Sequence, residues 1–123
     1  MKKIVLSILI LLILFGLSGC SGEYTLGSIE NNTSTKMSMT YHYFRGEKEK
    51  KLTVDEGEPL VVSVDIKTES GTLDAYIINE DDEYIYEGHD IPTSSFTVDL
   101  AEAGKYRIRV EAAKHKGSYS FTW

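Results

Sequence analysis

From residue 37 to residue 123, apolar and polar residues alternate in short runs. In the first run, Met37, Met39, Tyr41 and Tyr43 alternate with Ser38, Thr40, His42 and Phe44. The apolar members of the later runs are Leu60, Val62, Val64 and Ile66; Leu73, Ala75 and Ile77; Phe96, Val98 and Leu100; Tyr106, Ile108, Val110 and Ala112; and Tyr119, Phe121 and Trp123. A period of two is typical of antiparallel strands that bury one face on a core.

Turn-forming residues separate these runs, and no window shows a helical period. They include Gly46, residues 56–59, residues 70–71, residues 79–82, Gly88, Pro92, Gly104 and Gly117. Seven or eight short strands at this spacing predict an all-β fold. Because an isolated sheet leaves its apolar face in water, we expect two sheets packed face to face, an antiparallel β-sandwich spanning residues 37–123.

The first 19 residues follow a different pattern. Lys2 and Lys3 precede an uninterrupted, uncharged run over residues 4–17, which is followed by Ser18 and Gly19. This is the layout of a cleaved secretory signal peptide, residues 1–19. The alternative is a membrane-spanning helix, but the run of 14 residues is shorter than the roughly 20 that a span requires.

The signal peptide ends in Leu17-Ser18-Gly19-Cys20, which resembles the lipobox of bacterial lipoproteins. The resemblance implies cleavage between Gly19 and Cys20, and lipid attachment to the Cys20 thiol. Cys20 is the only cysteine in the chain, so a lipidated Cys20 leaves no thiol for a disulfide or for catalysis. Two or more acyl chains suffice for stable attachment to a membrane. The expected location is therefore a bacterial cell membrane, with the body on the extracytoplasmic side.

Residues 20–36 are polar and show neither a strand nor a helical period, so we interpret them as the lipidated cysteine and a flexible tether. The alternative for residues 24–26 is a short edge strand.

Loss of residues 1–19 removes two lysines and lowers the formal net charge from −6 to −8. An acidic surface of this kind argues against a nucleic-acid partner.

The C-terminal part contains three motifs with a glycine ahead of an alternating strand. They are Gly71-Thr72-Leu73-Asp74, Gly104-Lys105-Tyr106 and Gly117-Ser118-Tyr119. Together, over residues 52–123, they resemble the bacterial pre-peptidase C-terminal domain. The resemblance implies a jelly-roll-like sandwich, which in that family is usually an appendage of a secreted enzyme. Some members bind calcium or a polymeric substrate.

Residue types with catalytic chemistry are sparse. His42, His89 and His115 are dispersed and do not have the spacing of metal ligands. The sequence has no Gly-x-Ser-x-Gly nucleophile motif. We therefore expect a protein that is not an enzyme and that carries no obligatory cofactor.

The best candidate for a cation site is the acidic stretch 79–83, from which Asp81 and Asp82, together with Glu87, are the proposed ligands. Calcium prefers six to eight oxygen ligands, and carboxylates on a flexible loop supply them. The stretch lacks the spacing of a dedicated calcium loop and lies where a hairpin turn is expected. The alternative is therefore a solvated charged turn.

Aromatic residues offer a second candidate site. Tyr76 has the opposite parity to its apolar neighbours and is expected to face outward, while Tyr84 and Tyr86 are expected to share one strand face beside it. Exposed aromatic rings near carboxylates can hold a sugar ring or a protein partner. The alternative is that tyrosine simply suits strands.

These patterns predict a membrane-anchored envelope lipoprotein whose β-sandwich has a non-catalytic binding or accessory role. The alternative is a carbohydrate-binding module, assisted by calcium if the acidic stretch holds it. The partners expected are the membrane, through Cys20, and an envelope protein or polysaccharide.

Overall fold

A computed structural model describes residues 23–123, and this part of the chain is built from seven strands. The strands are β1 (Tyr24–Leu26), β2 (Ile29–Thr33), β3 (Lys36–Val54), β4 (Leu60–Asn79), β5 (Tyr84–Gly88), β6 (Ser94–Leu100) and β7 (Gly104–Thr122). The described residues include no helix long and apolar enough to cross a membrane. Gly19, Cys20 and the expected signal peptide lie outside the described residues.

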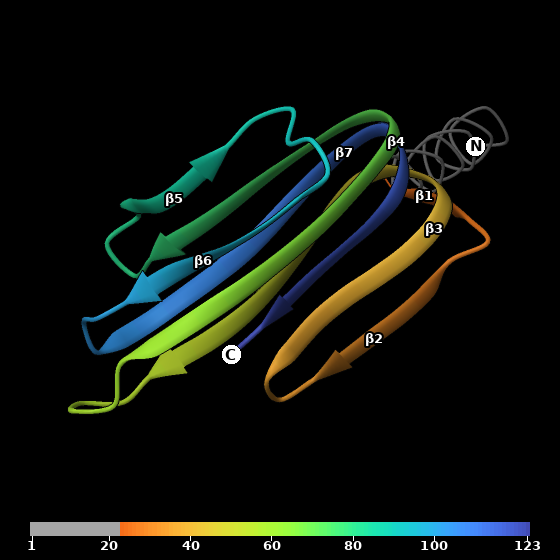
Figure 1. The fold of residues 1–123 in the computed structure, drawn as a ribbon. Helices are drawn as coiled ribbons and strands as arrows, with labels where there is room; N and C mark the ends of the chain where they lie inside the picture. Colours follow the sequence, from red (N-terminus) through yellow and green to blue (C-terminus); the bar gives the residue numbers. More distant parts are fainter. Residues whose placement is uncertain (1–22) are drawn as a thin grey trace, which may run out of the picture.

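All seven strands belong to one antiparallel sheet (Figure 1). Its centre is the trio β3, β7 and β4, in that order. β1 and β2 each pair with a different part of the outer edge of β3. β5 and β6 each pair with a different part of the outer edge of β4. The prediction of an all-β, antiparallel fold is confirmed.

Each of the three central strands is long enough to bend and run back over itself. Figure 1 shows β3, β4 and β7 turning together at the end of the molecule near β1. The bends coincide with register shifts between Tyr41 and Gly46 on β3, and between Thr68 and Thr72 on β4. The single sheet thus forms two layers. The first layer contains β2, β6 and residues 36–41, 60–67 and 118–122; the second contains β5 and residues 46–54, 72–79 and 104–112.

This continuity differs from the separate short strands that the sequence pattern indicates. Glycines at positions 71 and 117 look like chain reversals, but the structure uses them as bend points inside continuous strands. Both have positive φ, +74° at Gly71 and +147° at Gly117. A Cβ at Gly117 would collide with the Lys67 carbonyl oxygen, so only glycine permits the close approach of β4 and β7 at the bend.

The core lies between the two layers and follows the predicted parity. Buried members of the first layer include Met39, Val64 and Phe121, and those of the second include Ile77 and Ile108. The aromatic residues expected in the core, Tyr106, Tyr119 and Phe121, are all buried, and Trp123 packs against them partly buried.

The sheet begins earlier than expected, because two strands occupy the segment interpreted as a flexible tether. β1 pairs with residues 43–45 of β3, and β2 pairs with residues 36–40. All five side chains of β2 are exposed, so no period-two pattern marks the strand. The pairing instead satisfies the free backbone groups along the edge of β3, which the sequence does not reveal.

Candidate functional site

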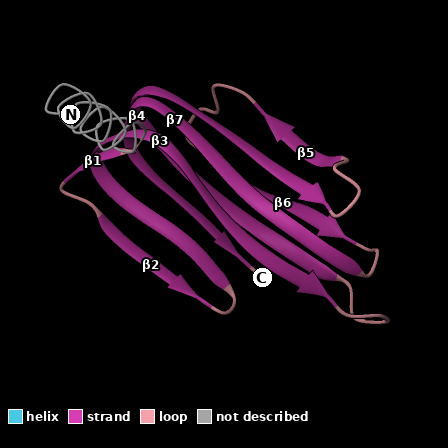
Figure 2. Ribbon diagram, turned by 180° about the vertical axis from the view of Figure 1, so that it is seen from behind, coloured by secondary structure: helices cyan, strands magenta, loops and turns pink. Residues whose placement is uncertain are grey.

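Aromatic and charged side chains gather on the outward surface of the second layer, near β5. Figure 2 shows the position of β5 in the sheet. The pairing of β7, β4 and β5 places Arg109 opposite Tyr76, and Tyr76 opposite Glu87. The next pair along β7 and β4 is Glu111 and Asp74. These side chains alternate with core residues, so they point away from the core.

Tyr76 points outward as predicted but is not an open binding platform. Only 7% of it is exposed, because the rings of Tyr84 and His89 lie 5.6 Å from its ring and the Arg109 guanidinium lies 5.1 Å from its centroid. This burial raises the pKa of Tyr76, and the neighbouring carboxylates, Glu111 foremost, raise it further. Tyr76 therefore serves as the base of a cluster whose outer ring is Tyr84.

Tyr84 and Tyr86 do not share a face, contrary to the prediction. The register of β4 and β5 shifts between Ile77 and Ile78, so Tyr86 lies opposite the core residue Ile77 and Tyr84 opposite Ile78. Tyr86 packs against Phe96 at the margin of the core, with ring centroids 5.2 Å apart. Tyr84 remains outside, 52% exposed. The bulge that separates the two residues left no signal in the alternation pattern.

His89 links two carboxylates beside this cluster. Its Nε2 lies 2.9 Å from Glu87 Oε1, and its Nδ1 lies 3.5 Å from Asp74 Oδ2. Hydrogen bonds to Glu87 and then to Asp74 raise the pKa of His89. Sequence reasoning missed the roles of His89 and Asp74 because the loop between β5 and β6 folds back on β4, where the Asp90 N–H donates to Asp74 Oδ1.

Arg109 completes the cluster from β7. One guanidinium nitrogen lies 3.3 Å from Glu111 Oε1, while its buried Nε has no hydrogen-bond partner in residues 23–123. A buried donor without a partner is rare in folded proteins. We name Tyr76, Tyr84, Glu87, His89 and Arg109 the outer aromatic cluster.

The proposed calcium ligands are not brought together. Asp82 pairs with Arg107 at 2.8 Å, and Glu87 pairs with His89. The Asn79 side chain accepts hydrogen bonds from the backbone N–H groups of Asp81 and Glu83, which shapes the turn without a metal ion. In the part of the chain that the structure describes, no group of three or more His, Cys, Asp or Glu residues has metal-binding geometry. The geometry is that of a solvated turn.

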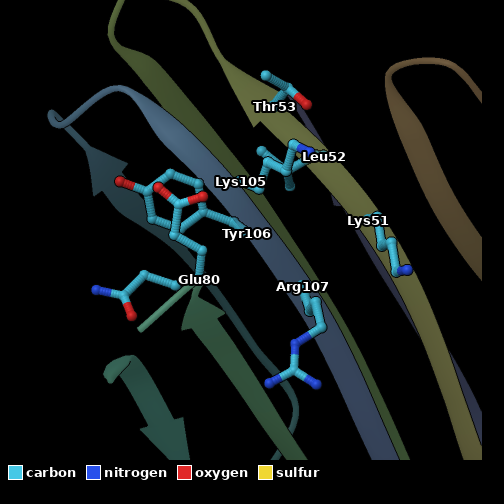
Figure 3. A pocket seen from close by; sticks show the side chains of 8 residues that line it. Lys51, Leu52, Thr53, Glu80, Lys105, Tyr106 and Arg107 are labelled. Carbon is cyan, nitrogen blue, oxygen red and sulfur yellow. The ribbon is translucent and has the colours of Figure 1, made fainter. Parts of the chain in front are cut away.

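A pocket of about 350 Å³ lies where the ends of β3, β7 and β4 meet (Figure 3). Its walls are formed by Lys51, Leu52, Thr53, Asn79, Glu80, Lys105, Tyr106 and Arg107. Lys51 lies directly opposite Arg107 on the neighbouring strand, a repulsive pairing in an otherwise acidic chain. Leu52 and Tyr106 form the apolar part of the pocket wall. The sequence did not indicate this pocket, because its cations come from strands that are distant along the chain.

His115 lies where β7 bends. It is fully buried. The Thr68 hydroxyl donates its single proton to the Ile91 carbonyl, so it accepts from His115 Nε2–H at 2.8 Å. The other nitrogen, Nδ1, then accepts from the Tyr41 hydroxyl. This network holds a neutral histidine inside the fold.

No family model matches the sequence, and no curated protein is significantly similar to it. Among solved structures, the chain resembles a family two carbohydrate esterase from Cellvibrio japonicus, with 12% identity and a TM-score of 0.38. The match covers 82% of this chain and 29% of that one, so the chain spans less than a third of the esterase structure. A similarity at this level carries no statement about function.

Proposed function

We propose that the protein is a non-catalytic binding lipoprotein of a bacterial envelope. Lipid attached to Cys20 holds it to the membrane, and the body lies on the extracytoplasmic side. The lipobox-like end of the apolar leader supports the anchor. We also infer that the folded sheet is a jelly-roll-like sandwich of the kind implied by the resemblance to the pre-peptidase C-terminal domain.

The proposed binding role rests on the arrangement of the rings in the outer aromatic cluster. The half-exposed Tyr84 ring rests on the covered Tyr76 ring, so its position is fixed before any ligand arrives. A rigid aromatic ring of this kind gives contact area at low entropic cost. Charged groups of both signs lie beside the supporting Tyr76 ring: the Arg109 guanidinium, and His89 with its partner Glu87.

The same arrangement favours a carbohydrate as the ligand, with an envelope protein as the other candidate. A sugar ring offers an apolar face for Tyr84 and hydroxyl groups for the carboxylates and His89. Aromatic stacking beside hydrogen-bonding side chains is a common plan for small-molecule sites. Calcium has no part in this proposal, because the carboxylates of the described residues are not grouped around a common point.

Binding to envelope polysaccharides, including peptidoglycan, tests the proposal. We expect Tyr84→Ala to weaken retention about tenfold, the loss of roughly 1.4 kcal/mol of contact. Tyr24→Ala is the matched control, because Tyr24 is exposed to a similar extent, 49% against 52%, but lies on β1. If no polysaccharide is retained, the carbohydrate ligand is ruled out. If both variants lose binding equally, binding at Tyr84 is ruled out. A photocrosslinker at position 84 that captures a protein in intact membranes would identify the other candidate.

A further inference from the structure

The chain between Cys20 and the folded body is short. β1 begins at Tyr24, so only residues 21–23 separate the strand from the residue that we propose to be lipidated. An extended residue spans at most about 3.6 Å, which places Tyr24 within about 14 Å of Cys20. The polar region on one side of a bilayer is itself about 5–8 Å deep. The first strand must therefore lie at the membrane surface if the proposed anchor is correct.

The side chains at this edge suit that position. Tyr24, Leu26 and Ile29 are 49%, 51% and 74% exposed, and they make up half of the six exposed large apolar residues in residues 23–123. Thr25 lies opposite the buried Phe44, so Tyr24 and Leu26 point outward on either side of it. The Tyr43 ring extends the apolar surface, 5.6 Å from the Tyr24 ring.

The charge distribution favours the same orientation. The bend end of the sheet, where β1 lies, carries the exposed cations Arg45, Lys114 and Lys116 beside the exposed carboxylates of Glu23 and Glu69, so its charges nearly balance. The acidic turns over residues 55–58 and 80–83 lie at the opposite end in Figure 1. An anionic bilayer therefore repels the distal end, where carboxylates outnumber the cations, more strongly than it repels the bend end.

We infer that the β1 edge, defined as Tyr24, Leu26, Ile29 and Tyr43, rests in the headgroup region of the bilayer that holds the lipid. This inference rests on the proposed anchor at Cys20. Tyrosine is enriched at this depth because its ring is apolar and its hydroxyl is polar. The acidic end then projects away from the membrane, and with it Tyr84 at the start of β5.

Depth-dependent fluorescence tests the inference on the lipidated protein. A cysteine introduced by Leu26→Cys carries an environment-sensitive dye, since lipid occupies the thiol of Cys20. The protein is placed in vesicles of phosphatidylethanolamine and phosphatidylglycerol that contain a headgroup nitroxide quencher. We expect a blue-shifted emission and at least twofold quenching. The same dye at Gly57→Cys, in a distal acidic turn, should keep the emission it has in water.

The outcomes separate the inference from its premise. Mass spectrometry of the same sample shows whether Cys20 carries lipid. If the protein is lipidated but the dye at position 26 is as exposed to water as the dye at position 57, the β1 edge does not rest in the bilayer. The anchor assignment then still holds. Absence of lipid overturns the anchor, and the inference with it. As a second measure, amide exchange in β1 should slow on vesicles, and Tyr24→Ser with Leu26→Ser should abolish the slowing, whereas Val61→Ser, at an exposed residue of β4, should not.

Discussion

His115 shows how one buried side chain makes stability depend on pH. Burial lowers the pKa of His115, and its Nδ1 is occupied as an acceptor from Tyr41. Below a pH of about 6.5 the unfolded chain binds a proton that the folded chain does not. The free energy of unfolding should therefore fall as the pH drops from about 6.5 to 5.5, by up to about 1.4 kcal/mol per pH unit. Chemical denaturation across this range measures the slope.

His115→Gln should remove this acid-side slope, although it also lowers stability at pH 8 by disturbing the network. His89 is the natural control because its pKa is raised. Its pairing with Glu87 and Asp74 stabilises the fold below about pH 6.5, and that contribution is lost as the pH rises through the raised pKa. His89→Gln should thus leave the acid-side slope in place. An unchanged slope in His115→Gln would show that other groups titrate there.

At the scale of the element, the bends in β4 and β7 decide how the sheet folds over. Gly117 approaches the Lys67 carbonyl so closely that a side chain has no space, and Gly71 approaches the Lys114 carbonyl in the same way. We expect Gly117→Ala to lower the free energy of unfolding by about 4 kcal/mol or more, since backbone on both strands must move.

Gly57→Ala is the control for this prediction. Gly57 also has positive φ, +79°, but a Cβ at this position would meet no other atom within 4 Å. Its substitution should cost about 1 kcal/mol, the strain of a left-handed backbone alone. Equal losses of stability in thermal melts of the two variants would refute the steric argument.

For the whole molecule, the anchor and the folded body are separable. The core of residues 23–123 is built from side chains of the two layers. We expect Cys20→Ser to move the protein from the membrane fraction to the soluble fraction without changing its melting temperature by more than about 2 °C. Fractionation and thermal unfolding measure the two effects. A variant that stays lipidated and in the membrane would contradict the assignment of Cys20.

The sequence alone determined which faces of most strands are buried. Alternation is a local property, so Val64, Ile108 and Phe121 could be placed in the core from their neighbours. The expectation of an all-β, antiparallel fold followed from the same pattern. The lipid anchor at Cys20 was also inferred from the sequence, and it remains a prediction. The glycines were visible as breaks, but the sequence could not distinguish a chain reversal from a bend in a continuous strand.

Only the tertiary structure decided what depends on contacts between distant segments. β2 exists because β3 offers it a free edge, and none of its own side chains is buried. A single bulge turned Tyr86 toward the core and left Tyr84 outside. The outer aromatic cluster and the pocket at the ends of β3, β7 and β4 both gather side chains from strands far apart in sequence. Strand alternation reports the environment of one segment, whereas pairing register and sheet bending set which segments meet.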